Sequence, residues 1–273
     1  MRKIVHMSDL HFGRTDDAVV ESLVETVVEI APDLVVVSGD LTQRAKSREF
    51  AAARTFLDRL PKPQVVVPGN HDVPLYNVYK RFVMPLKGFT RFITNDLTPF
   101  YLDDEIAAIG VNTARSLTIK DGRISKEQVA EISSRLSPLS EELTKIVVTH
   151  HPFDLPAGFH SGDLVDRAEK AMPAIAESGA DIFLSGHLHV SHITDSAARY
   201  RLASGRSGLI IQAGTATSTR GRGERNSFNL IEIDSPKLTV SHFELSNNRK
   251  PFEVRSSQSF EKTPNGWLSV KST

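Results

Sequence analysis

The chain has 273 residues, and its 33 lysine and arginine residues are balanced by 33 aspartate and glutamate residues, so its formal net charge is zero. This balance provides no general basic field, which disfavours anionic membranes and extended nucleic acid as partners. The absence of cysteine excludes a disulfide framework, a thiol nucleophile and an iron–sulfur cluster.

The start of the chain and its apolar runs bear on the cellular compartment. No apolar run approaches the roughly 18 residues that are needed to cross a bilayer. The first apolar run begins almost at Met1, which leaves no room for a cleavable signal peptide. We therefore expect a cytoplasmic protein with no membrane partner.

The first part of the chain alternates between two patterns. Residues 2–8, 34–38 and 64–68 are short apolar runs rich in β-branched residues, which are typical of buried strands. Apolar residues at helical spacing predict helices over 16–30 and 47–60. This β-α-β-α-β order predicts a parallel sheet.

Residues 73–105 interrupt the alternation with several prolines and many aromatic residues, and we interpret them as a cap insert beside the functional site. The pattern then resumes with a strand over 106–111. A helix over 125–136 follows, opened by a Ser125–Gln128 capping box.

The sequence changes character again after residue 189. Runs at 208–213, 228–233 and 238–245 predict short strands joined by turns without helices, as in an antiparallel sheet or edge. Residues 249–273 are polar and irregular, and we interpret them as a tail. We expect residues 1–248 to form a single domain.

Five short polar motifs directly follow apolar runs, namely the three runs above and two further β-branched runs at 145–149 and 181–185. The motifs are Asp9-Leu10-His11, Gly39-Asp40, Gly69-Asn70-His71-Asp72, His150-His151 and Gly186-His187-Leu188-His189. Loops at the carboxyl ends of parallel strands face one crevice, so these distant residues can meet at one place. Asp9 and His11 are two residues apart, and alternate side chains on a strand leave the same face, so we expect both to reach one ion.

The residue types in these motifs indicate metal chemistry. Carboxylate, imidazole and amide ligands without thiolate favour Mn, Fe or Zn. Two divalent ions about 3.5–4 Å apart form a common apparatus for attack on phosphorus, because they generate a hydroxide nucleophile and neutralise charge on the oxygens. The motifs therefore predict phosphoester hydrolysis with two divalent metal ions.

The pattern D-x-H, GD, GNHD, HH, GHxH resembles the calcineurin-like metallophosphoesterases over about residues 3–217. Its GDLT, GNHD and THHP motifs are most similar to those of the bacterial class III cyclic-nucleotide phosphodiesterases and glycerophosphodiesterases. The resemblance implies an α/β fold in which two central mixed sheets lie between helical layers, a four-layer α-β-β-α sandwich.

The resemblance also implies a role for each residue. Asp9, His11, Asp40 and His189 would hold the first metal, with Asp40 bridging to the second. Asn70, His150 and His187 would complete the second site. His71 would bind no metal and would meet the substrate or leaving group as a catalytic proton donor.

Other interpretations of these residues stay open at this stage. Asp9 and Asp40 could cap helices, and Asn70 could occupy a left-handed turn. His71 and Asp72 could form a surface turn. His151 is interpreted as a wall or substrate-binding residue rather than a ligand, because an adjacent residue on a strand points the other way.

Three arginines are candidates for substrate binding. Arg44 matches the arginine of the GDxVDRG motif of protein phosphatases, although Gln43 and Ala45 replace the flanking Asp and Gly. Arg220 and Arg222 could clamp a phosphate with their planar guanidinium groups, or they could belong to a solvated loop.

These observations lead to a functional hypothesis, hydrolysis of a small phosphodiester such as a cyclic nucleotide or a glycerophosphodiester. GNHD in place of GNHE and the incomplete GDxVDRG motif argue against a protein phosphatase. The alternatives are a promiscuous phosphomonoesterase, a nuclease or a non-catalytic scaffold. Homo-oligomerisation stays open.

Overall fold

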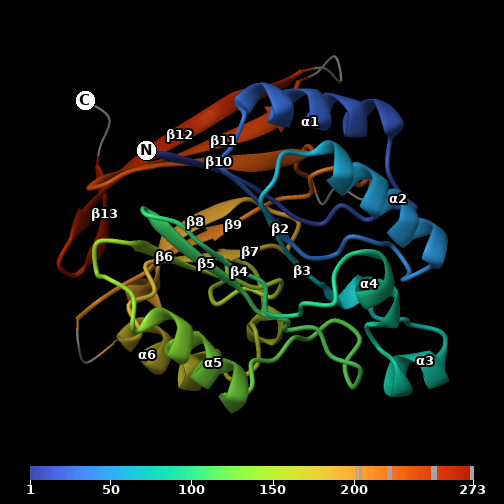
Figure 1. Ribbon diagram of the computed structural model, residues 1–273, viewed down its shortest axis with the longest axis horizontal. Helices are drawn as coiled ribbons and strands as arrows, with labels where there is room; N and C mark the ends of the chain where they lie inside the picture. Colours follow the sequence, from blue (N-terminus) through green and yellow to red (C-terminus); the bar gives the residue numbers. More distant parts are fainter. Residues whose placement is uncertain (201, 203–204, 220–222, 247–250, 271–273) are drawn as a thin grey trace.

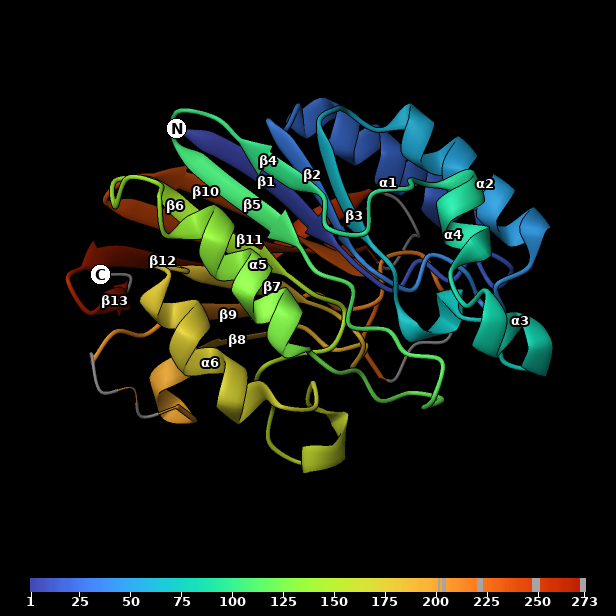
Figure 2. The same cartoon turned by 60° about the horizontal axis from the view of Figure 1, so that its bottom comes forward.

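In the computed structural model, the described residues are 1–200, 202, 205–219, 223–246 and 251–270. Two β-sheets pack face to face, and helices cover the outer face of each (Figure 1, Figure 2). The strand order is β13-β12-β11-β10-β1-β2-β3 in the first sheet and β4-β5-β6-β7-β9-β8 in the second. The expected four-layer α/β architecture is therefore confirmed.

The first sheet contains the predicted β-α-β-α-β series. Its parallel strands are β1 (Arg2–Met7), β2 (Leu34–Ser38) and β3 (Gln64–Val67). The crossover helices α1 (Asp17–Ile30) and α2 (Ser47–Arg59) bury their apolar stripes against its outer face. Asp16 caps α1 by accepting a hydrogen bond from the amide of Ala18 at 3.0 Å.

The second sheet holds β4 (Phe100–Leu102), β5 (Ile106–Gly110), β6 (Thr144–Val148), β7 (Ile182–Ser185), β8 (His192–Asp195) and β9 (Leu209–Gln212). The helices α5 (Lys126–Leu136) and α6 (Ala168–Glu177) cover it. The capping box of Ser125 and Gln128 is present. Residues 208–213 were expected in an antiparallel arrangement. Strand β9 does pair antiparallel with β8, but it runs parallel to β7, so the prediction is wrong for one of its two neighbours.

The C-terminal strands form an antiparallel series that extends the first sheet from β1. They are β10 (Ser227–Asp234), β11 (Lys237–Leu245), β12 (Phe252–Thr263) and β13 (Gly266–Val270). The expectation of an irregular tail from 249 is therefore wrong for 252–270. A few buried residues, Phe252, Phe260 and Trp267, anchor these strands, while their many exposed polar residues conceal the strand pattern in the sequence.

Only part of the expected cap insert at 73–105 stands apart from the sheets and their covering helices. The segment contains the short helices α3 (Val78–Val83) and α4 (Lys87–Phe92). Phe89 of α4 is buried in the core beneath α2, and β4 pairs with β5. The residues that adjoin the functional site are those before α4.

The apolar layer between the sheets fixes how their edges align. Ile4 and Val36 from the first sheet contact a layer that includes Ile146 and Leu184 from the second.

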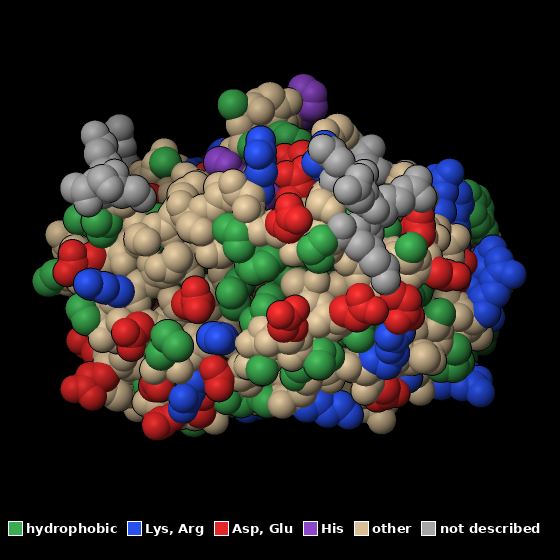
Figure 3. All heavy atoms as spheres, turned by 90° about the horizontal axis from the view of Figure 1, so that it is seen from above, with side chains coloured by type: hydrophobic (Ala, Val, Ile, Leu, Met, Phe, Trp, Pro, Cys, Tyr) green, Lys and Arg blue, Asp and Glu red, His purple; other side chains and the backbone are tan. Residues whose placement is uncertain are grey.

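The face over α1 mixes acidic and basic side chains with smaller hydrophobic groups (Figure 3). Within the described ranges, no helix combines the length and the apolar character that a membrane span requires.

Candidate metal centre

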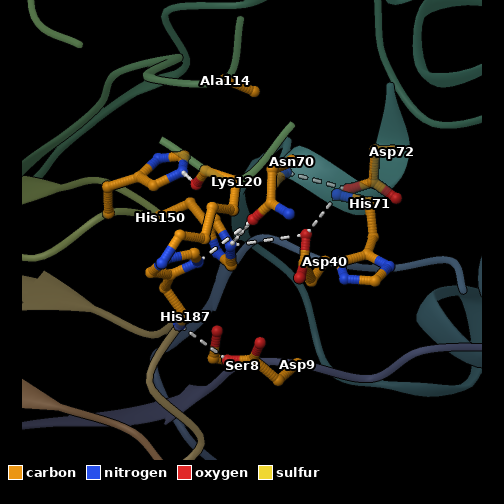
Figure 4. A network of polar contacts seen from close by, with 12 residues as sticks. Ser8, Asp9, Asp40, Asn70, His71, Asp72, Ala114, Lys120, His150 and His187 are labelled. Atoms are coloured by element: carbon orange, nitrogen blue, oxygen red, sulfur yellow. Dashed lines mark hydrogen bonds and ion pairs between the residues drawn. The ribbon is translucent and has the colours of Figure 1, made fainter. Parts of the chain in front are cut away.

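The five predicted motifs meet where the carboxyl ends of strands from both sheets come together (Figure 4). The loops after β1, β2 and β3 supply one side, and those after β6 and β7 supply the other. The crevice therefore lies between the two sheets, at the carboxyl ends of strands from both.

Five of the predicted site residues have a left-handed backbone. Asp9, His11, Asp40, His187 and His189 have φ angles of 54, 51, 52, 73 and 63°. Such values are uncommon outside glycine and cluster at functional sites. The strand-alternation argument for Asp9 and His11 is therefore wrong in its reason, because these residues lie in a tight turn after β1 that aims both side chains inward.

Glycine is required beside the ligands because the loops approach one another closely. A Cβ on Gly69 would lie 2.1 Å from Asp40 Oδ1, and one on Gly186 would lie 1.8 Å from Ser8 Oγ. No side chain fits at these distances. The glycines of the GNHD and GHLH motifs thus allow the carboxylates to reach the centre.

The first cluster contains Asp9, His11 and His189, all buried. Asp9 Oδ1 lies 3.6 Å from His11 Nε2 and 3.4 Å from His189 Nε2. The other carboxylate oxygen, Oδ2, accepts a hydrogen bond from the backbone amide of His187 at 2.9 Å. Oδ1 accepts no hydrogen bond, although it is buried. A buried carboxylate oxygen that faces two imidazole nitrogens has the surroundings of a cation ligand.

The second cluster joins Asn70, His150 and His187. Asn70 Oδ1 lies 3.1 Å from His150 Nε2 and 3.1 Å from His187 Nδ1. The amide Nδ2 of Asn70 is oriented away, donating to the carbonyl of Ile119 at 3.4 Å. The amide oxygen therefore points into the same space as the two imidazole nitrogens.

Asp40 lies between the clusters. Its Oδ2 is 3.7 Å from His11 Nε2 in the first cluster, and its Oδ1 is 3.4 Å from His150 Nε2 in the second. Burial alone would raise the pKa of Asp40, but His150 and His71 hold it well below its usual range. This is the position that a bridging carboxylate needs.

Outer hydrogen bonds orient two of the imidazoles. His150 Nδ1 donates to the carbonyl of Ser38 at 2.8 Å, which directs its Nε2 toward Asn70 and Asp40. His189 Nδ1 contacts Thr215 Oγ1 at 2.7 Å, which directs its Nε2 toward Asp9. Metal-binding histidines commonly have such a partner on the second ring nitrogen. The donor set therefore fits divalent cations, and the family resemblance implies two.

His71 lies beside the first cluster. Its ring is 4.7 Å from that of His11, edge to face, and its Nδ1 donates to the carbonyl of Gln43 at 2.9 Å. This leaves Nε2 as the nitrogen available to the site, and the half-buried ring is open to an incoming molecule.

Asp72 is a positioning residue, and its full burial contradicts the surface turn that the sequence left open for it. It is fully buried, and its carboxylate accepts hydrogen bonds from the amides of Leu41, Thr42 and Gly69 at 2.9–3.1 Å. It thereby joins the loop after β2 to the loop after β3. The only available sequence signal was its place in GNHD.

His151 groups spatially with His150 and His187, but both its ring nitrogens already have protein partners. Nε2 donates to the carbonyl of Lys120 at 2.9 Å, so Nδ1 accepts from the hydroxyl of Thr113 at 2.8 Å. Burial, together with His187, keeps its pKa well below the usual value, which matches a neutral ring. This geometry supports the wall interpretation, in which His151 holds the loop before Gly122 against the centre.

The predicted arginines have different surroundings. Arg44 lines a pocket of about 240 Å³ together with Asn70, His71 and Tyr76, and its guanidinium lies over the ring of Tyr76. Arg220 and Arg222 lie outside the described residues. Elsewhere in the arginine-rich stretch, Arg199 pairs with Asp154 and Arg225 pairs with Glu244.

The sequence model of the calcineurin-like phosphoesterase family matches residues 2–191, which contain all five motifs. The chain belongs to this family. The glycerophosphodiester phosphodiesterase GpdQ of Enterobacter lignolyticus is 28% identical over 171 residues, a match that covers 56% of this chain and 58% of that protein. A probable cyclic nucleotide phosphodiesterase of Synechococcus is 24% identical over 202 residues, covering 70% of this chain and 74% of that protein.

Solved structures share the fold of this phosphoesterase chain. A dimetal phosphatase from Danio rerio superposes with a TM-score of 0.65 at 12% identity, covering 93% of this chain and 99% of that one. The purple acid phosphatase PPD1 of Lupinus luteus gives a TM-score of 0.67 at 11% identity, covering 94% of this chain and 53% of that one. At these identities the likeness shows the fold alone.

Proposed function

We propose that this phosphoesterase hydrolyses small phosphodiesters, such as a cyclic nucleotide or a glycerophosphodiester, with two divalent ions drawn from Mn, Fe and Zn. The observation that carries the proposal is the position of Asp40 within 4 Å of imidazole nitrogens from both clusters. When bound, two such ions activate water and neutralise charge on a phosphate group.

The protein's own groups would complete the reaction. Asp9, His11 and His189 would hold one ion, and Asn70, His150 and His187 the other, with Asp40 between them. His71 would protonate the departing oxygen through Nε2 as a general acid. Its Nδ1 bond to Gln43 fixes the ring for that task.

The pocket beside His71 supports a small substrate. Its volume of about 240 Å³ is below the roughly 300 Å³ at the low end for drug-sized ligands. Arg44 at its edge offers a planar cation that can hold one phosphate oxygen. A diester carries one negative charge, which this arrangement can neutralise. The names of the two curated relatives point in the same direction.

The test is a substrate panel with Mn-loaded protein. We expect the highest kcat/KM on a cyclic nucleotide, glycerophosphocholine or bis-p-nitrophenyl phosphate, and lower values on p-nitrophenyl phosphate and plasmid DNA. If the monoester or the DNA is processed best, the proposed substrate class is wrong. If metal-loaded protein hydrolyses nothing in the panel while binding two ions, a non-catalytic role replaces it.

A further inference from the structure

The helix α3 has its charged and apolar residues reversed relative to a typical surface helix. Arg81 points inward and is buried, donating to the carbonyls of Pro74, Ser116 and Thr118. The apolar side chains point outward: Val78 and Tyr79 are each 66% exposed, Phe82 is 53% exposed and Val83 is 55% exposed. A helix of a water-soluble surface normally buries its apolar face, so this exposure needs an explanation.

The apolar patch continues onto the loop that Arg81 anchors. Leu117 and Ile119 are 75% and 65% exposed, and Tyr76 is 75% exposed. Together with the outward residues of α3, these side chains form what we call the apolar rim: Tyr76, Val78, Tyr79, Phe82, Val83, Leu117 and Ile119. The pocket beside His71 opens on this rim, since Tyr76 and Ile119 line both.

The exposed charges beside the apolar rim are mainly basic, although Asp121 and Asp163 lie next to Lys120 on its far loop. Residues 73–95 include four basic residues and no acidic residue, although the whole chain is balanced. Among them, Lys80 and Lys87 are exposed, and Arg44 and Lys46 are exposed on the neighbouring loop. The expectation of no membrane partner rested on the balanced net charge and the lack of a long apolar run, and neither of these reports a local basic and apolar surface.

We propose that the apolar rim docks the protein on a bilayer that contains anionic phospholipids. Outward aromatic and aliphatic side chains would enter the boundary between headgroups and acyl chains, and the surrounding lysines and arginines would contact the anionic headgroups. The rim adjoins the pocket at Tyr76 and Ile119, so docking would bring the pocket and the candidate metal centre close to the lipid surface. The docking proposal does not depend on which phosphoester the centre hydrolyses.

Two other occupants fit the rim less well. A second copy of the chain in a symmetric dimer would place this basic surface against itself, which like charges oppose. A small substrate would fill the pocket next to His71 but would leave Tyr79, Phe82 and Val83 uncovered, because they do not line it. A broad anionic surface covers all of these residues at once.

Co-sedimentation with vesicles tests the proposal. Wild-type protein should bind vesicles of phosphatidylcholine with phosphatidylserine, bind vesicles of phosphatidylcholine alone weakly, and dissociate as salt is raised. Tyr79→Ser/Phe82→Ser should lower the partition coefficient by about tenfold or more, because two large apolar side chains no longer enter the bilayer. Its hydrolysis of soluble bis-p-nitrophenyl phosphate and its thermal unfolding should match the wild type.

A matched pair of single variants controls for loss of surface hydrophobicity. Val83→Ser should weaken vesicle binding, whereas Val254→Ser, at a residue 54% exposed on β12, should not. The proposal is overturned if wild-type protein ignores anionic vesicles at low salt, or if both valine variants bind equally well. It is also overturned if light scattering shows a dimer that Tyr79→Ser/Phe82→Ser dissociates, since the rim would then bind a second copy.

Discussion

The backbone amide of His71 donates a hydrogen bond to Asp40 Oδ1 at 2.8 Å. The carboxylate between the two clusters is thereby joined to the residue that we propose as proton donor, and Asp72 joins their loops a second time. Any displacement of Asp40 should therefore affect both metal binding and the placement of the His71 ring.

Replacing Asp40 with Asn should remove the shared carboxylate. We expect Asp40→Asn to bind fewer than two ions and to lose more than about 100-fold in metal affinity, the upper end of the loss seen for outer partners of metal ligands. Metal analysis after dialysis measures this. Chelation should abolish hydrolysis and Mn should restore it. Asp104→Asn, at an exposed carboxylate, is the control. Full activity of chelated protein would contradict the proposed centre.

His71→Ala should retain its metals and lose rate. General acid catalysis contributes about 10²–10⁴-fold, so that is the loss expected on diesters with poor leaving groups. The loss should be smaller with bis-p-nitrophenyl phosphate, because p-nitrophenolate departs without a proton. Equal losses on both substrates, or loss of metal, would rule out the proposed role.

The hydroxyl of Thr215 should raise the metal affinity of the first cluster through its contact with His189. Thr215→Val removes the hydroxyl that contacts His189 Nδ1, and such outer partners typically contribute about 10–100-fold in metal affinity. Thr215→Ser retains the hydroxyl and should bind metal as the wild type does. Titration of metal-free protein compares the three, and similar affinities for valine and serine variants would show that the contact has no effect.

Gly186→Ala should damage both the fold and the centre. The added methyl would lie 1.8 Å from Ser8 Oγ and 2.6 Å from Asp9 Oδ2, and overpacking of this kind costs about 1–3 kcal/mol. We expect a lower free energy of unfolding and weaker metal binding. Gly162→Ala is the control, since a methyl there would meet no atom within 4 Å. Denaturant unfolding of both variants checks the difference.

His6 should make stability depend on pH. Burial lowers its pKa to about 3 in the folded protein, against 6.5 for the free side chain. The unfolded chain therefore binds the extra proton first, and the free energy of unfolding falls as the pH drops from 6.5 toward 3. In this range it falls by up to about 1.4 kcal/mol per pH unit. His6→Gln should remove this component, so the variant and the wild type should diverge in unfolding free energy between pH 7 and 5. Parallel pH profiles would show that His6 does not contribute.

The sequence could predict the ligand candidates because each of them directly follows a buried strand. Local pattern and the geometry of parallel strands were enough to bring Asp9, Asp40 and His187 together. Thr215 and Thr113 gave no such signal, because a single hydroxyl beside a histidine depends on how distant segments pack. The strand β12 was missed for a related reason: its neighbours decide which of its residues are buried, and most of its side chains are polar and exposed.

The division of the candidate ligands between two sheets has a consequence for folding. Asp9, His11, Asp40 and Asn70 follow strands of the first sheet, whereas His150, His187 and His189 follow strands of the second. Neither sheet alone holds either complete cluster, so high-affinity binding requires both to be in place. Ions that bind only the assembled protein stabilise it by mass action. Bound metal ions would thus link the two sheets. Their removal would weaken the contact between the sheets before it weakened either sheet.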